Sequence, residues 1–150
     1  MPITAPHLAH QAGVPGQWSD TISPTPEGLI AGDTPHVVTV DRQFAASQTI
    51  AAYTPVGEDA SGNLVPALTG SVDPADDIQA IGITLAPITV GATPLLGGPV
   101  LIAASVALDM LNWPASFDTD AKKLAAFNGA PTPTNIVVRV RYRGATVANP

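Results

Sequence analysis

The residues best suited to chemistry include two pairs of side chains near the N-terminus. His7 and His10 form an H-x-x-H pair, which can bind a metal ion when a helix aligns both imidazoles. This pair lies in a Pro- and Gly-rich stretch without a nearby carboxylate, and we predict no metal site there. His36 and Asp33 could form a general base and its orienting carboxylate. However, the chain has no cysteine, and no serine in a G-x-S-x-G turn, to act as nucleophile, so we interpret His36 as an exposed residue at a strand start.

Two further groups have suitable residue types in an unsuitable pattern. Asp73, Asp76 and Asp77 could hold a hard cation, but their spacing is not that of a D-x-[DN]-x-[DN]-G loop with a following Glu. They are typical of a solvated turn. Gly97 and Gly98 do not stand between a strand and a helix in a phosphate-binding motif. The sequence therefore predicts no catalytic site, no cofactor and no metal, and we expect the protein not to be an enzyme.

Composition narrows the class of protein further. The 150 residues are 45% hydrophobic and only 12% charged, which predicts one packed domain with few charges on its surface. The net charge of -6 argues against nucleic acid as a partner, because binding phosphates requires clustered Lys and Arg. The longest apolar runs, such as residues 99–108, are too short to span a bilayer, so we expect no membrane partner. The N-terminus lacks the pattern of a secretory signal.

Strand signals dominate from residue 36 onward. Segments rich in β-branched residues, separated by turns of Gly, Pro, Asn and Asp, predict a mainly β domain, or an α+β domain with one or two short helices. The clearest hairpin signal lies within residues 53–67, where the turn contains Asp59, Ser61, Gly62 and Asn63. We expect the other strands at residues 36–40, 43–52 (a weaker strand or turn), 78–90 (with Gly82 as a bulge), 100–111 and 136–143, with loops at 70–77 and 91–99.

The last predicted strand alternates between two kinds of side chain. One face carries Ile136, Val138, Val140 and Tyr142, and the other carries Val137, Arg139, Arg141 and Arg143. A period of two predicts a half-buried strand with one wet face. The basic stripe could bind a carboxylate-rich partner, while a solvated strand face is the simpler interpretation.

Residues 111–130 contain the one clear helix signal. Trp113 and Pro114 precede it, and we expect Asp118 to cap its N-terminus and Gly129 to end it in a left-handed conformation. About ten residues are too few for a stable isolated helix, so this helix must dock on the sheet. We expect Trp113 to be buried where the preceding strand meets the helix. The predicted buried side of the helix consists of Ala121, Leu124 and Ala125, with Phe127 beside them.

Residues 1–34 are rich in proline and glycine and show neither strand nor helix periodicity. Each proline removes a backbone donor and restricts the residue before it, so we expect an extended arm without packed elements. Its apolar residues are too sparse to form a core but could be buried against a partner. Composition alone leaves a plain disordered tail as an equal alternative. The candidate binding residues of this arm are Trp18, Ile22, Leu29 and Ile30.

Several segments resemble a known family. They are TPVGEDASGNLVPALTG (54–70), AIGITLAPI (80–88) and LNWPASFDTDAKKLAAFNG (111–129), preceded by FAASQTIAAYTPVG (44–57). The most specific is the third, in which Trp-Pro is followed by a short, acid-capped helix with two lysines. On these residues the chain from Tyr53 onward resembles the head decoration proteins of lambda-type tailed bacteriophages, which bind the outside of the capsid.

This resemblance implies a small β-sandwich or barrel-like domain that forms homotrimers at the local three-fold positions of an expanded icosahedral head. It implies an arm that binds the major capsid protein, and trimers that stabilise the capsid against internal DNA pressure. Residues 1–34 would be the capsid-binding arm, 35–143 the decoration domain and 144–150 a C-terminal tail. The protein would be made in the host cytoplasm and act on the outer surface of the virion. The arm and tail are longer than in the shortest family members, so individual capsid contacts do not transfer.

A β-rich surface recognition module, for example one that binds carbohydrate, is the alternative function. The aromatic side chains that stack on sugars are scarce, with two Trp, two Tyr and three Phe in the chain. A hydrolase ranks third, because it would need a set of active-site residues that the sequence does not provide.

Overall fold

The computed structural model describes residues 28–140, and its mainly β fold confirms the predicted class. Among these residues it has one short α-helix and two 3-10 turns. Across the described range, no helix has the length and apolar character needed to cross a membrane. In chain order the elements are β1 (Ile30–Gly32), β2 (Val38–Phe44), β3 (Gln48–Ile50), β4 (Pro55–Glu58), β5 (Leu64–Pro66), η1 (Pro74–Asp76), β6 (Gly82–Thr84), β7 (Ile88–Val90), β8 (Leu95–Ala107), η2 (Leu108–Met110), α2 (Asp120–Ala125) and β9 (Asn135–Arg139).

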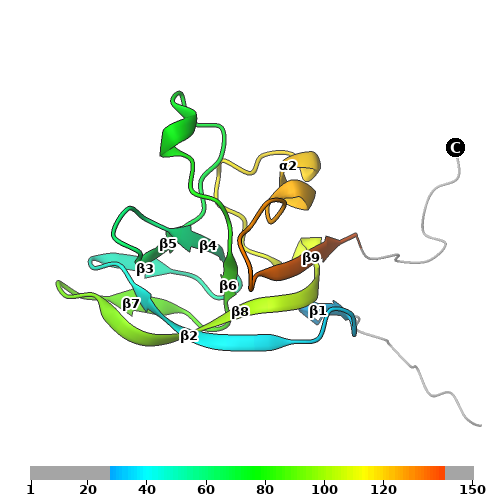
Figure 1. Cartoon of the computed structure of the whole chain (residues 1–150), viewed down its shortest axis with the longest axis horizontal. Helices are drawn as coiled ribbons and strands as arrows, with labels where there is room; N and C mark the ends of the chain where they lie inside the picture. The colour runs from blue at the N-terminus through cyan, green and yellow to red at the C-terminus, as the bar shows by residue number, and fades with distance from the viewer. Residues whose placement is uncertain (1–27, 141–150) are drawn as a thin grey trace, which may run out of the picture.

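Five strands close into a barrel-like ring. β8 pairs with β2, β2 with β5, β5 with β4 and β4 with β6, and β6 returns to pair with β8. Leu101 of β8 shows the closure, because it stands opposite Thr39 of β2 and also opposite Ile83 of β6. Only β2 and β5 pair in parallel within this ring. β3 and β7 form a separate two-stranded antiparallel sheet (Figure 1).

β8 is the longest described strand, and its two halves pair with different strands. Its first half belongs to the ring, and its second half pairs with β9 on one edge and with β1 on the other. β1 and β2 follow the same edge of β8, with Gly32 opposite Ser105 and Val38 opposite Ala103. Residues 33–37 therefore loop out opposite a single residue of β8.

A bulge in β8 lies between the two parts of the core. Val38 and Thr39 stand opposite Ala103 and Leu101, so Ile102 is an extra residue that changes the alternation of side chains. The barrel cluster contains Phe44, Ile50, Val56, Leu64, Ile81, Ile88, Val90, Val100 and Ile102. The lid cluster contains Ala67, Ala80, Ile83, Leu101, Ala104, Val106, Leu111, Phe117, Ala126, Phe127 and Ile136.

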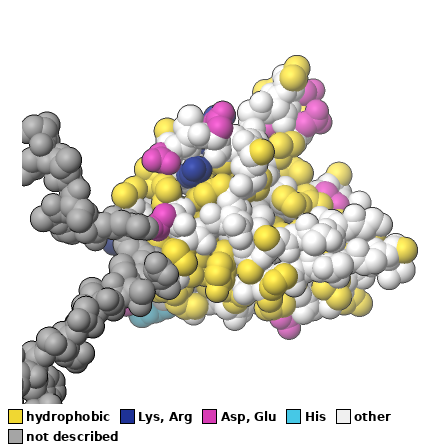
Figure 2. Space-filling view, turned by 180° about the vertical axis from the view of Figure 1, so that it is seen from behind, with side chains coloured by type: hydrophobic (Ala, Val, Ile, Leu, Met, Phe, Trp, Pro, Cys, Tyr) yellow, Lys and Arg dark blue, Asp and Glu magenta, His cyan; other side chains and the backbone are white. Residues whose placement is uncertain are grey.

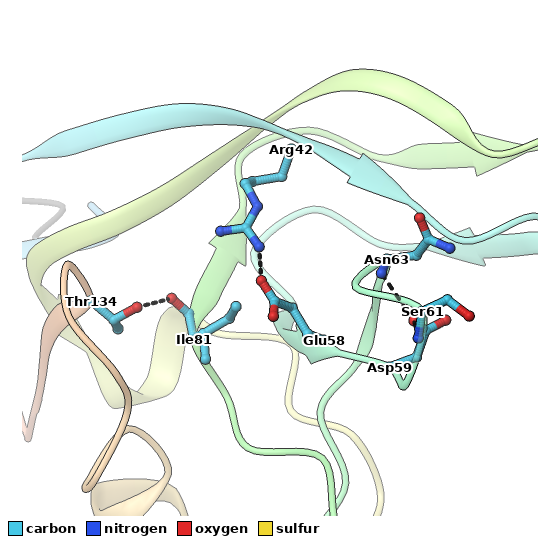
Figure 3. Close-up of polar contacts among 7 residues, drawn as sticks. All are labelled: Arg42, Glu58, Asp59, Ser61, Asn63, Ile81 and Thr134. Carbon is cyan, nitrogen blue, oxygen red and sulfur yellow. Dashed lines mark hydrogen bonds and ion pairs between the residues drawn. The ribbon is translucent and has the colours of Figure 1, made fainter.

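The predicted hairpin is confirmed as β4 and β5. Asp59 organises its turn, because the Oδ1 atom accepts from the backbone N–H of Ser61 at 2.8 Å and of Asn63 at 2.9 Å (Figure 3). Gly62 has a φ of 79°, which glycine adopts without steric strain. These local contacts explain why the turn could be predicted from its residue types.

Two polar contacts tie together segments that are distant in the sequence (Figure 3). Arg42 of β2 forms an ion pair with Glu58 of β4, and these two strands lie on either side of β5. Thr134 Oγ1 donates to the backbone carbonyl of Ile81 at 2.8 Å and joins the segment before β9 to the segment before β6. The ion pair is partly exposed, so we expect it to contribute little to stability and mainly to orient the two strands.

The structure corrects the strand predicted over residues 78–90. The segment contains two strands, β6 and β7, which pair with different partners and are separated by residues 85–87. Gly82 is not a bulge but the first residue of β6, where a Cβ atom would overlap the side chain of Val100. The glycine is needed there because β6 approaches β8 closely.

The loop predicted over residues 91–99 is too long. β8 begins at Leu95, and Gly98 within it lies against the ring of Phe44, where a Cβ atom would overlap that ring. Gly98, one of the two adjacent glycines in the predicted loop, therefore makes room for an aromatic side chain. The strands predicted at 36–40 and 136–143 are present with shifted bounds, as β2 and β9.

α2 is shorter than predicted, and a different residue caps it. Its N-cap is Thr119, whose Oγ1 accepts from the backbone N–H of Lys122 at 3.3 Å. Asp118 instead forms an ion pair with Lys122 Nζ at 2.8 Å. The predicted Asp118 cap is wrong because Thr119, one residue later, has the extended backbone and the contact that define a cap.

The buried side of the helical segment also differs from the prediction. Leu124 is 41% exposed, whereas Phe127 is buried in the lid cluster as predicted, together with Ala126. Because the helix ends at Ala125, the turn that follows it supplies the inward side chains. Gly129 has a φ of 80°, the predicted left-handed conformation, but it lies in that turn and not directly after the helix.

Trp113 is half-buried and covers the lid cluster from its edge, so the prediction of a buried Trp113 is only partly right. Its Nε1 donates to the backbone carbonyl of Leu108 at 2.8 Å. Its ring lies 5.5 Å from the ring of Phe117, which is the buried aromatic residue of the pair. The carbonyl of Pro114 accepts from the N–H of Phe117 and fixes the turn between them.

β1 lies inside the arm that was predicted to have no packed element. It pairs with the second half of β8, and the carbonyl of Leu29 accepts from the N–H of Ala107 at 2.9 Å. The prediction is wrong for Ile30–Gly32 because β8 extends past the end of β2 and offers these residues a strand edge. The preceding residues, 1–27, lie outside the described range.

Candidate interaction surface

The described residues contain no metal site. Within residues 28–140, no group of three or more His, Cys, Asp and Glu side chains could hold a metal ion. Asp33 and His36 are both exposed in the loop between β1 and β2, and Asp33 accepts a hydrogen bond from Thr34 Oγ1 at 3.4 Å. His7 and His10 lie outside the described range.

The acidic loop between β5 and β6 is folded by its own carboxylates. Asp73 caps η1 by accepting from a backbone N–H of its first turn at 3.0 Å. Asp77 accepts from the N–H of Ser71 at 2.8 Å and of Gly70 at 3.2 Å. The hydrogen bonds from Ser71 hold the pKa of Asp77 below its ordinary value, because they favour the ionised carboxylate. These contacts support the interpretation of a solvated turn.

Exposed apolar side chains lie at the start of β2, where Val38 stands opposite Ala103, and on two other strands, β1 and β9. The two strands flank the second half of β8 at the same end of the molecule (Figure 1). Each of these side chains is more than a third exposed. We call this set the terminal patch, and it spans both faces of this end of the sheet, because Val137 and Val140 alternate along the chain. It consists of Ile30, Val37, Val38, Val137 and Val140.

The loop of residues 33–37 is joined to β9 by one hydrogen bond. Arg139 of β9 donates to the carbonyl of Thr34 at 3.5 Å, although β9 and β1 lie on opposite edges of β8. The side chain of Arg139 therefore links β9 to the loop on the other edge of β8. Of the predicted basic stripe, Arg139 is exposed, while Arg141 and Arg143 lie outside the described residues.

The four candidate arm residues have different positions. Ile30 is exposed and belongs to the terminal patch, whereas Leu29 packs against the lid cluster of its own chain. Trp18 and Ile22 lie outside the described residues. The sequence analysis did not identify Val37 as a loop residue on the surface, because its β-branched neighbours predicted a strand over residues 36–40. In the structure β2 begins at Val38.

A scan against protein-family models and a search of the curated proteins find no match to this chain. No relative therefore supplies a function or a role for any residue. The function rests on the geometry of the terminal patch and on the segments that resemble decoration proteins.

Proposed function

We propose that this chain is a structural protein of a phage head. It binds the outer surface of the expanded icosahedral head as a homotrimer at the local three-fold positions, and it stabilises the capsid against internal DNA pressure. Its partner is the major capsid protein. No cofactor, nucleic acid or membrane takes part, and the protein has no catalytic role.

The way the N-terminal segment joins the domain carries the proposal. Residue 28 leads into β1, a three-residue edge strand beside the terminal patch. Residues 1–27 therefore continue directly from an exposed apolar surface that also includes Val140, near the other end of the described chain. A segment attached in this way can bind a partner while the patch rests on the same partner surface. Apolar side chains grouped on an otherwise polar surface are typical of protein interaction sites.

The segments that resemble decoration proteins meet in one place. Residues 54–70 contribute Ala67 to the lid cluster, residues 80–88 contribute Ile83, and residues 111–129 contribute Phe117 and Phe127. Segments with a common structural role would be expected to pack together in this way. This arrangement supports a shared fold for the resembling region.

Multivalency explains how such a protein would act without a reaction. Three arms on one trimer turn a weak single contact into a strong combined one, provided that all three can reach the capsid together. A trimer that binds the expanded head and not its dissociated subunits stabilises that head by mass action. The small number of charged residues leaves the binding to depend on apolar and main-chain contacts.

Co-sedimentation with expanded, empty phage heads tests the proposal. We expect the full chain to pellet with the heads, and a chain that lacks residues 1–27 to stay in the supernatant with an unchanged circular dichroism spectrum and melting temperature. The deletion stops before β1, so every described residue is kept. Equal binding by the shortened chain would reject the role of the arm. Failure of the full chain to bind, combined with specific binding to a glycan array, would favour the carbohydrate alternative.

A further inference from the structure

We propose that the tip of the loop between β7 and β8 of one copy inserts into a cavity beside α2 of the next copy. This inference rests on the proposed function in one respect, the number of copies. It names the contact through which the three copies of the proposed homotrimer would join. It concerns a part of the domain remote from the terminal patch.

The tip consists of residues 91–97, all of which are exposed. It carries two adjacent leucines, and Leu96 is 75% exposed at the start of β8. Gly97 next to it has a φ of 78°, which glycine adopts without strain, and it lies where the pairing of β8 with β2 shifts register.

The tip belongs to a long uncharged part of the chain. No charged residue lies between Asp77 and Asp109, a range that includes β6, β7 and β8. In Figure 2 hydrophobic and uncharged side chains predominate at the end of the molecule opposite the grey segments. Copies of a chain with a net charge of -6 repel one another, and this tip adds no charge of its own when it meets the cavity, whose wall carries Asp77 and Lys122. This argument favours a second copy as the occupant.

A cavity of about 370 Å³ opens between α2 and the segment that joins β5 to β6. An engineered cavity of about 150 Å³ with apolar walls accepts benzene, so this one has room for a leucine side chain. Leu68, which is itself exposed, lies on its wall. The apolar part of the wall is formed by Leu68, Ile78, Ala80, Phe117, Ala125 and Ala126.

Three polar side chains of the cavity, those of Gln79, Lys122 and Asp77, have partners within the chain. Gln79 Nε2 donates to the carbonyl of Ala126 at 2.6 Å. Lys122 Nζ pairs with Asp118 at 2.8 Å, and Asp77 accepts from two backbone amides of its own loop. A leucine side chain that enters would therefore contact the apolar part of the wall without displacing these internal contacts.

The two features also satisfy the symmetry of a trimer. A cyclic trimer needs two different patches that complement each other, because each copy contacts its neighbours through unlike surfaces. The tip and the cavity lie at different places on the domain. The tip is the loop at the left of Figure 1, and the cavity is lined by α2 and by the segment that joins β5 to β6. A projection on one surface and a hollow on another can repeat around a closed ring.

Cysteine pairing tests the contact directly, since the natural chain has no cysteine. We expect the double variant Leu96→Cys with Ala125→Cys to form covalent three-chain rings on oxidation, either free in solution or bound to expanded heads. Each single-cysteine variant should form at most linked dimers. Absence of three-chain products under both conditions would overturn the inference.

Mass measurements on full-length variants separate this contact from a tip-to-tip contact. Leu96→Asp and Ala125→Trp should each reduce a free trimer to monomers, while a mixture of the two should form two-chain species through the one intact interface. Ser61→Asp, which adds the same charge to the turn of the β4–β5 hairpin, should leave the trimer intact. If Leu96→Asp alone dissociates the trimer and Ala125→Trp does not, the tip contacts another site and the inference fails. If the chain is monomeric in solution, cysteine pairing on heads decides.

The outcomes also distinguish this inference from the proposed function. Loss of head binding on deletion of residues 1–27, with cysteine pairing unchanged in solution, would support both. Head binding without any pairing of Leu96→Cys with Ala125→Cys would reject only the trimer contact. Pairing in solution without head binding would reject only the proposed function.

Discussion

The barrel cluster and the lid cluster are enclosed in different ways. A ring of hydrogen-bonded strands surrounds the barrel cluster, together with the sheet of β3 and β7. The lid cluster has β8 and β9 on one side, but on the other it is covered by irregular chain that carries Leu111, Phe117 and Phe127. Strand pairing enforces the position of every side chain along its length, whereas a loop places only a few inward. The two clusters should therefore respond differently to substitution.

The largest expected effect is the removal of the aromatic ring at the centre of the barrel cluster. Phe44 is fully buried, and Gly98 lies against its ring. We expect Phe44→Ala to lower the free energy of unfolding by about 5 kcal/mol, near the upper end for such substitutions, because paired strands cannot collapse into the cavity. Phe127→Ala in the lid cluster should cost about 3 kcal/mol, since irregular chain relaxes more easily. Urea denaturation measures both, and an equal or larger loss for Phe127→Ala would contradict the contrast.

Trp113 comes next, because it covers the lid cluster without being enclosed by it. We expect Trp113→Ala to lower the free energy of unfolding by about 2 kcal/mol, less than the loss for a fully buried aromatic residue. Trp113→Phe keeps a ring beside Phe117 but loses the hydrogen bond to Leu108, and it should cost about 1 kcal/mol. Thermal unfolding followed by circular dichroism would show the order. A loss above about 4 kcal/mol for Trp113→Ala would mean that the residue belongs to the core itself.

A smaller effect should identify the residue that starts the lid helix. We expect Thr119→Ala to lower the free energy of unfolding by about 1 kcal/mol, because the N–H of Lys122 loses its acceptor. Thr119→Ser keeps the hydroxyl and is the matched control. Asp118→Ala should have a smaller effect than Thr119→Ala, because the ion pair it removes is exposed. The reverse order in chemical denaturation would restore Asp118 as the cap.

The smallest effect concerns the acidic loop beside the lid. The pKa of Asp77 is lower in the folded protein than the ordinary value of 3.8, so its carboxylate stabilises the loop above that pH. This contribution is lost as the pH falls through the folded-state pKa. We expect the amide signal of Ser71 in NMR spectra to shift over that acidic range, and the shift to vanish in Asp77→Asn. An Asp77 titration at or above 3.8 would contradict the hydrogen-bond arrangement.

The contrast between the clusters also explains what the sequence could predict. The hairpin turn could be predicted because Asp59, Gly62 and Asn63 act within a few residues of one another. The cap could not be assigned, because Asp118 and Thr119 are both good capping residues and only the backbone conformation distinguishes them. Leu124 was misjudged for a similar reason, since its burial depends on where a short helix ends, whereas Phe127 is buried as predicted.

The interaction surfaces depend on contacts that are still more distant in sequence. β1 exists because β8 continues beyond β2, and no local signal around Ile30 contains that information. The segment 78–90 showed continuous strand character, yet β6 and β7 join different sheets. Likewise, the leucines of the tip and the cavity wall are ordinary residues in the sequence. Only their exposure and position suggest a contact between copies.

β8 also has a consequence for the cooperativity of the domain. It supplies Val100 and Ile102 to one cluster and Leu101, Ala104 and Val106 to the other, within a single uninterrupted strand. Neither half can open without releasing hydrogen bonds that the other half needs. The amide hydrogens of this strand should therefore exchange with solvent only when the whole domain unfolds. We expect no populated intermediate in which the lid cluster alone is unfolded, so thermal unfolding should follow one two-state transition.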